Sequence, residues 1–171
     1  MVNENINIDD IKVVTGANKL DKTKYEGFRI QIAKVSPEHI QDQFPKGVDG
    51  QPAVYTPNST AMKWVIRIET APLPELDADG KATAKLIEFP QKDGTMKNFT
   101  ITHDFNLQEE FNPETKQMEV AISKHPKAKL WAFMRKMGAQ KVSELNKKLV
   151  TLTAQPSKKE GDDRIFLSIV V

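Results

Sequence analysis

The stretch SKHPKAKLWAFMRKMG, residues 123–138, predicts a helix in a chain whose other segments have mostly β patterns. Pro126 suits a first helical position, and Gly138 suits the position just after a helix end. Apolar side chains recur at helical spacing and predict a face that packs on a core: Leu130, Phe133, Met134 and Met137. The opposite arc is mostly basic, with Lys129, Arg135 and Lys136. The sequence therefore predicts a helix that covers a sheet or barrel and presents a basic back.

Alternating apolar and polar side chains predict strands before this helix. Tyr25–Val35 and Ala61–Thr70 are the two clearest, and a shorter β-like run spans residues 11–15. Residues 84–105 predict a hairpin with one face formed by Phe99, Ile101, His103 and Phe105, and residues 118–123 predict a further short strand. Between the two clearest predicted strands, the segment Ser36–Ser59 contains four prolines, which predicts a long loop.

After the helix, residues 142–145 predict a brief helical turn, and residues 149–154 and 164–171 predict a terminal hairpin. Strands, one helix and two final strands form the element order of a five-stranded oligonucleotide-binding barrel. We therefore expect a mainly β fold, an OB-like Greek-key β-barrel with one capping α-helix before the final hairpin. Residues 1–171 are expected to form a single domain, with the barrel from about residue 25 and residues 1–24 as an N-terminal extension.

Charge is distributed unevenly along the 171 residues. Residues 1–123 contain 14 Lys and Arg against 19 Asp and Glu, whereas residues 124–171 contain 11 against 4. A net charge of +7 in the C-terminal part, against −5 before it, favours an anionic partner addressed by one part of the surface. A lysine-rich surface that is merely solvated is the alternative, and charge alone does not separate the two.

The chain has no cysteine, no apolar run long enough to span a bilayer, and a polar start without the features of a signal peptide. A soluble, cytoplasmic protein without a membrane partner is expected. Three histidines, at positions 39, 103 and 125, have no metal-ligand spacing, and no nucleophile or phosphate-loop motif is present. We therefore expect neither an enzyme nor a cofactor or metal site; the DADG fragment, residues 77–80, lacks the later ligands of a calcium loop.

The segment KLWAFMRKMGAQKVSELNKKLVTLT, residues 129–153, resembles the helix-to-strand passage of OB-fold single-stranded DNA-binding proteins from phages and archaea. In that family a helix ending in glycine leads through a short Glu-Leu turn to a strand entered with a Gly-Lys or Lys-Lys pair. Asn146-Lys147-Lys148 stands where many such proteins have a glycine. The resemblance implies a binding protein for single-stranded nucleic acid, with DNA as a more probable partner than RNA.

Binding to a single strand requires cations for phosphates and flat side chains for bases. If the apolar strand faces point inward, the outward face carries Tyr25, Arg29, Lys63 and Arg67, extended by Asn98 and Thr100. The predicted helix start adds Lys124, His125, Lys127 and Lys129, beside backbone N–H groups suited to phosphate. Tyr25 and Tyr55 are the expected stacking residues, whereas Trp64 and Trp131 are assigned to the core.

Two other interpretations stay open at this point. Polar alternation occurs in every half-solvated sheet, and lysines in a solvent-screened first turn lose little energy, so neither pattern requires a ligand. The chain could also be a protein-interaction or structural module that uses the loops 36–59 and 72–80 to contact its partner.

Overall fold

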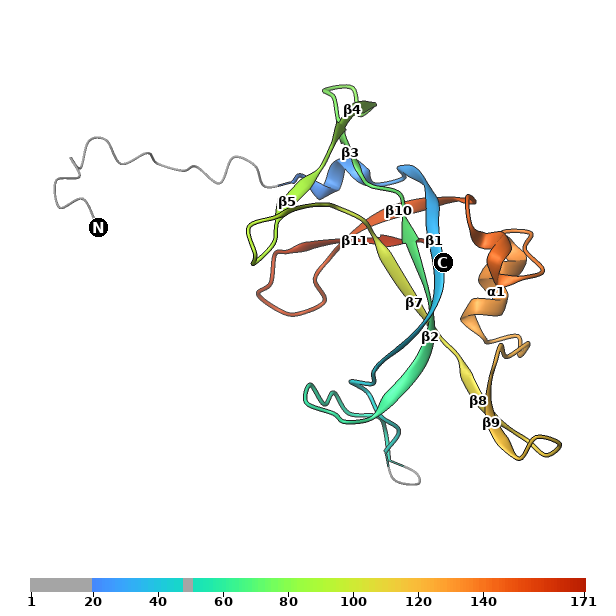
Figure 1. The fold of residues 1–171 in the computed structure, drawn as a ribbon. Coiled ribbons are helices and arrows are strands. Elements are labelled where there is room, and N and C mark those ends of the chain that lie inside the picture. The colour runs from blue at the N-terminus through green and yellow to red at the C-terminus, as the bar shows by residue number, and fades with distance from the viewer. Residues whose placement is uncertain (1–19, 48–50) are drawn as a thin grey trace.

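The computed structural model describes residues 20–47 and 51–171 (Figure 1). It contains a five-stranded antiparallel sheet with the strand order β11-β10-β1-β2-β7. The strands are β1 (Arg29–Gln41), β2 (Met62–Thr70), β7 (Thr102–Asn106), β10 (Leu149–Pro156) and β11 (Ile165–Ile169). The prediction of a mainly β fold is confirmed. The predicted strand at residues 11–15, and most of the predicted extension 1–24, lie outside the described residues.

Smaller elements project from this sheet (Figure 1). They form three two-stranded hairpins, β3 (Pro74–Leu76) with β4 (Ala82–Leu86), β5 (Glu88–Pro90) with β6 (Met96–Asn98), and β8 (Gln108–Asn112) with β9 (Gln117–Ala121). Two 3-10 turns, Lys22–Tyr25 and Val142–Leu145, pack Tyr25 and Leu145 into the core. The second turn was predicted from the sequence and is confirmed.

Strand β1 is the centre of the sheet. Its first residues pair with β10, and the rest pairs with β2 after a register shift between Ile32 and Lys34. A bulge of this kind bends a strand, and the outer strands β7 and β11 of the sheet contact one another. The prediction of a loop from Ser36 is wrong for its first six residues, because β1 continues to Gln41. Pro37 is tolerated because β2 is the only described strand that pairs with this half of β1.

The segment predicted as one hairpin, residues 84–105, is divided among three pairings. β4 pairs with β3, β5 pairs with β6, and β7 joins the sheet beside β2. The single hairpin is therefore wrong, since turns at residues 77–80 and 91–95 close two local hairpins instead. The predicted inward face is confirmed: Ile101 and Phe105 are buried, and Phe99 packs against them.

Helix α1 (Lys129–Lys136) packs Leu130, Phe133 and Met134 on the core, where the Phe133 ring lies 5.2 Å from that of Phe105. The predicted start at Pro126 is wrong, because residues 123–128 form a turn and the helix begins at Lys129. The predicted end is confirmed. Gly138 has a φ of +68°, and the N–H groups of Gly138 and Ala139 donate to the last carbonyls, which is the Schellman arrangement.

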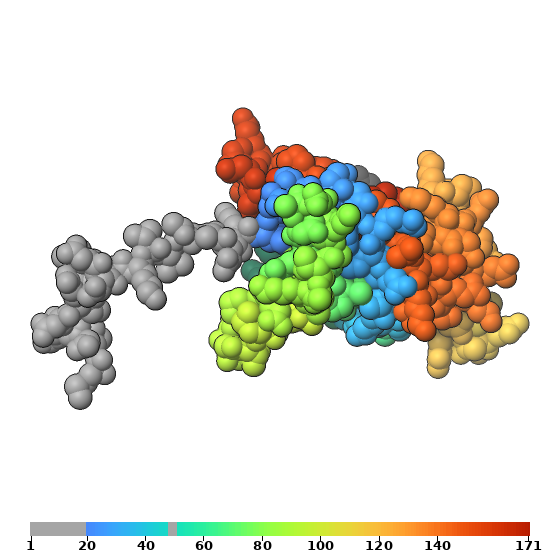
Figure 2. All heavy atoms as spheres, turned by 90° about the horizontal axis from the view of Figure 1, so that it is seen from above, coloured from blue at the N-terminus to red at the C-terminus, as the bar shows by residue number. Residues whose placement is uncertain are grey.

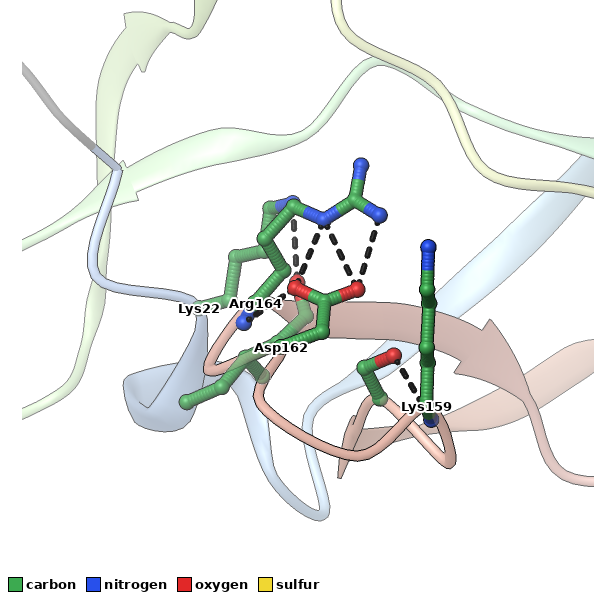
Figure 3. A network of polar contacts seen from close by, with 6 residues as sticks. Lys22, Lys159, Asp162 and Arg164 are labelled. Carbon is green, nitrogen blue, oxygen red and sulfur yellow. Dashed lines mark hydrogen bonds and ion pairs between the residues drawn. The ribbon is translucent and has the colours of Figure 1, made fainter.

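The terminal hairpin of β10 and β11 is also confirmed. In its turn, Arg164 donates to both carboxylate oxygens of Asp162, and Lys22 Nζ donates to the carbonyl of Ile165 at 2.9 Å (Figure 3). The hydrogen bonds from Arg164 hold the pKa of Asp162 well below its usual value. The charge of Arg164 is therefore balanced inside this turn.

Candidate functional site

The outward face of β1, β2 and β7 is not the cationic face that the sequence predicted. Arg67 donates to both carboxylate oxygens of Asp104, at 2.7 and 2.8 Å. These bonds lower the pKa of Asp104 and raise that of Arg67, to which the nearby charges of Glu38 and Glu69 also contribute. Because carboxylates surround Arg67, its predicted role as a free phosphate contact is not supported by this arrangement.

The other residues predicted on this face are scattered. Tyr25 is only 2% exposed and donates from its hydroxyl to the carbonyl of Pro74, so its placement on the outward face is wrong. The Thr100 hydroxyl donates to Glu69 at 2.9 Å, and Asn98 is half-buried on β6. Arg29 is exposed on β1, opposite Thr151 of β10. These side chains do not form one binding surface.

The other predicted cations do lie together, on the turn that precedes α1 and on the first residue of the helix. We call residues 123–129 the basic ridge; its basic side chains, all exposed, are Lys124, His125, Lys127 and Lys129. The turn is held by side chains, since His125 N–H donates to Ser123 Oγ and Lys127 N–H donates to His125 Nδ1 at 3.1 Å. His125 Nδ1 is thus an acceptor, which leaves its Nε2 for any ligand. No side chain caps the start of α1 at Ala128.

No cation of the basic ridge forms an ion pair with any of the described residues. The ion pairs among the described residues involve Lys63, Arg67, Lys85 and Arg164 instead. Seen from above, the orange segment that contains α1 lies at one end of the molecule, away from the green hairpins of residues 74–98 (Figure 2). The ridge is therefore a local group of uncompensated positive charge.

Trp131 lies beside this ridge and is half-buried, outside the buried core. Lys124 Nζ lies 5.3 Å from the centre of its ring, within the range of a cation–π contact. The two side chains line an open hollow of about 600 Å³ together with Arg135 and Gln140. We call this the Trp131 hollow. The assignment of Trp131 to the core is wrong, because the neighbouring Leu130 and Met134 already fill the contact with the sheet.

Trp64 is also half-buried and also outside the core. It stacks on His39 of β1, with ring centres 4.7 Å apart and an angle of 13° between the planes. Exposure rises along this face of β2 from 0% at Ile68 through 7% at Ile66 to 51% at Met62. The alternation identified the correct face of β2. The core assignment is wrong because burial on this face decreases from Ile68 towards Met62, so that Trp64 is only partly buried.

A groove of about 970 Å³ opens at this end of the sheet, and we call it the Trp64 groove. Its lining comes from β2, β7, the β8–β9 hairpin, the basic ridge and the loop after β1. It brings the predicted residues Lys63 and Lys129 together, and adds Lys46, which sequence reasoning missed. Nothing in the local sequence pattern distinguishes Lys46 from other loop lysines.

His103 faces the same groove and is half-buried, with its ring 4.5 Å from that of Phe105. Burial lowers its pKa, and the positive charge of Lys129 lowers it further, although Asp104 acts in the opposite direction. These effects together favour the neutral form of the imidazole. Its predicted place at the edge of the core is confirmed.

A third hollow, of about 500 Å³, lies beside Tyr25 and is lined by Asp21, Glu75 and Glu88 as well as by two lysines. One of these, Lys85, is paired with Glu75. A polyanion is disfavoured there because the carboxylates outnumber the lysines.

Residues 20–47 and 51–171 contain no group of three or more His, Asp or Glu side chains that could hold a metal ion. Within the same ranges, no helix has the length and apolar character needed to cross a bilayer.

No protein-family model, no curated protein and no solved structure matches this chain. The interpretation of the site therefore depends on its own geometry and charge.

Proposed function

We propose that the protein binds single-stranded DNA, without catalysis, on the surface formed by the basic ridge and the Trp131 hollow. The observation that carries this proposal is the arrangement around Trp131. A half-exposed indole lies beside Lys124 and Arg135, and neither cation has a carboxylate partner among the described residues. Phosphates need cations that are not already neutralised, and bases need flat apolar faces, so this hollow offers both.

A single strand suits this surface better than a duplex. Stacking on Trp131 needs a base whose face is free, and in a duplex both faces are covered by neighbouring bases. Lys127 and Lys129 are exposed on the same ridge as Lys124 and add positive charge for the phosphates of a flexible backbone. The preference for DNA over RNA derives from the resemblance of residues 129–153 to DNA-binding proteins.

The fold that accompanies this function is proposed to be an OB-like barrel. In support, the strand order β11-β10-β1-β2-β7 places the first strand at the centre, and α1 lies in the connection from β7 to β10. The contact between β7 and β11 brings the two edges of the sheet together, as closure of a five-stranded Greek-key barrel requires.

The test is a titration of fluorescently labelled single-stranded and double-stranded oligonucleotides at two salt concentrations. The unmodified protein should bind the single strand more tightly, and Trp131→Ala should weaken this binding by about 5-fold to 100-fold. Trp131→Phe should retain most of the affinity, because a phenyl ring still stacks. Equal binding of the two oligonucleotides, or full affinity in Trp131→Ala, would contradict the proposed site.

A protein-interaction module is the second candidate. Exposed apolar side chains in the loop after β1 favour it, with 56% of Phe44, 66% of Val54 and 57% of Tyr55 accessible. The other predicted contact loop, 72–80, is partly wrong as a loop, since Leu73 is fully buried and Pro74–Leu76 forms β3. Size-exclusion chromatography with and without an oligonucleotide distinguishes the candidates, since only the DNA-binding function predicts a shift on adding the oligonucleotide.

A further inference from the structure

We propose that the Trp64 groove is a base-binding site, occupied by unpaired bases of the same strand whose phosphates contact the basic ridge. This inference depends on the proposed function and extends it, because it assigns a second stacking residue and a second binding region. The two regions are predicted to bind different parts of the strand: phosphates on the ridge, and bases in the groove.

The charge of the groove excludes a continuous track for phosphates. Its lining includes three lysines, but also three carboxylates: Lys46, Lys63 and Lys129 against Asp42, Asp104 and Glu109. Lys63 lies 3.8 Å from Asp42, and Asp104 is bound to Arg67, so part of this charge is already balanced. Lys129 belongs to the basic ridge as well, and without it the lining has two lysines against three carboxylates. The rest of the groove therefore does not attract a polyanionic backbone, but it can accept uncharged bases.

The shape of the lining suits flat, partly apolar groups. Trp64 is held in place by its stack on His39. Met118 of β9 and Ile122, which directly follows β9, also line the groove. In the β8–β9 pairing Glu109 lies opposite Val120, and Phe111 lies opposite Met118. Glu109 and Met118 are therefore on the same face of the hairpin, and both line the groove. The groove therefore offers a base one indole face and two flexible apolar side chains, which suit a flat and partly apolar group.

The basic ridge lies between the Trp64 groove and the Trp131 hollow. Ser123, Ala128 and Lys129 line the Trp64 groove, whereas Lys124 lines the Trp131 hollow, so the turn from residue 123 to residue 129 separates the groove from the hollow. Phosphates over Lys127 and Lys129 would lie at the margin of the groove. A strand that crosses the ridge can therefore place bases on either side of it.

The fluorescence of each tryptophan can be measured separately, because the chain contains only two. In Trp131→Phe the indole emission comes from Trp64 alone, and in Trp64→Phe it comes from Trp131 alone. Titration of each variant with unlabelled oligothymidylates of increasing length should quench both indoles, since stacked bases quench indole emission. Short oligonucleotides should quench Trp131 first, and longer ones should be needed to quench Trp64 fully.

Affinity provides the second measurement. Trp64→Ala should weaken binding of long single strands by about 5-fold to 100-fold and leave binding of the shortest ones nearly unchanged. Phe166→Ala is the matched control, because Phe166 is 46% exposed and also lies near cations, Lys22 and Arg164, but belongs to β11 and does not line the groove. It should bind like the unmodified protein.

Failure of this inference is distinguishable from failure of the proposed function. If Trp131 is quenched while Trp64 emission stays constant at saturating DNA, the groove does not bind bases, and the ridge and hollow are retained. If neither indole responds and the oligonucleotides do not bind, both proposals are wrong. Quenching of Trp64 by an unrelated peptide but not by DNA would assign the groove to a protein partner and overturn the inference.

Discussion

Replacing the lysines of the basic ridge should reduce the salt dependence of DNA binding. In Lys124→Gln/Lys127→Gln/Lys129→Gln the side-chain length is nearly kept, and three exposed positive charges are removed. Each phosphate contact on a single strand contributes about 0.7 to the slope of log K against log salt. Loss of three contacts should therefore lower the slope by about 2.

The same arithmetic gives a directly measurable ratio. Between 50 and 200 mM salt, three contacts account for roughly an 18-fold loss of affinity, because a four-fold change in salt raised to a slope of about 2.1 gives that factor. The triple variant should bind more weakly than the unmodified protein at 50 mM salt, and the difference should shrink by about this factor at 200 mM. Fluorescence anisotropy of a labelled oligothymidylate at several salt concentrations measures both quantities.

The matched control removes the same charge elsewhere. Lys81, Lys92 and Lys97 are exposed on the hairpin region of residues 74–98, away from α1 (Figure 2). If only the net charge matters, Lys81→Gln/Lys92→Gln/Lys97→Gln should lower affinity and slope as much as the ridge variant does. Equal slopes in the two triple variants would refute the assignment of phosphates to the ridge. An unchanged slope in the ridge variant would remove this segment from the interface.

Three further predictions concern the stability of the scaffold. Phe133→Ala should lower the free energy of unfolding by about 3 to 5 kcal/mol in urea titrations, because its ring is 1% exposed and packs on Phe105. Gly138→Ala should cost about 1 kcal/mol in the same assay, since φ is +68° although no atom obstructs a Cβ. Asp104→Asn should remove one contribution to the pH dependence of the free energy of unfolding. The ion pair with Arg67 lowers the pKa of Asp104 below its usual 3.8. The pair therefore stabilises the fold above that pH, and this stabilisation is lost as the pH falls through the lowered pKa. Acid titrations of the unmodified protein and Asp104→Asn should therefore converge at low pH; parallel curves would show that the pair does not contribute.

The strand and helix pattern was readable from the sequence where local periodicity and long-range pairing agree. The face of β2 that carries Ile66 and Ile68, the terminal hairpin, and the end of α1 at Gly138 are of this kind. The extension of β1 through Pro37 was not predictable locally, because it depends on pairing with residues 62–67 of another strand. The division of residues 84–105 depends on which strands find partners, which periodicity does not encode.

The candidate site was predictable only in part, because alternation predicts which face of a strand a side chain is on but not how deeply it is buried. Trp64 points to the same side as Ile66, yet Ile66 is 7% exposed and belongs to the core, whereas Trp64 is only half-buried. Tyr25 shows the reverse error. Strand alternation predicted an outward side chain, but Tyr25 belongs to a 3-10 turn before β1, and its hydroxyl donates to the carbonyl of Pro74 inside the fold. Similarly, the sequence marks Arg67 as a cation but does not reveal that Asp104 lies beside it on β7.

These errors have a common physical origin. Correcting them moves the proposed phosphate contacts from the face of the sheet to the basic ridge. On paired strands, an outward cation has cross-strand neighbours at about 5 Å, so an acidic partner such as Asp104 can neutralise Arg67. A turn and the first residue of a helix have fewer such neighbours, and there Lys124, Lys127 and Lys129 form no ion pair with any described residue. A protein that must attract phosphates therefore gains more from cations on a connection than from cations inside a sheet. That argument, more than the count of basic residues, is why we assign the phosphates to the ridge.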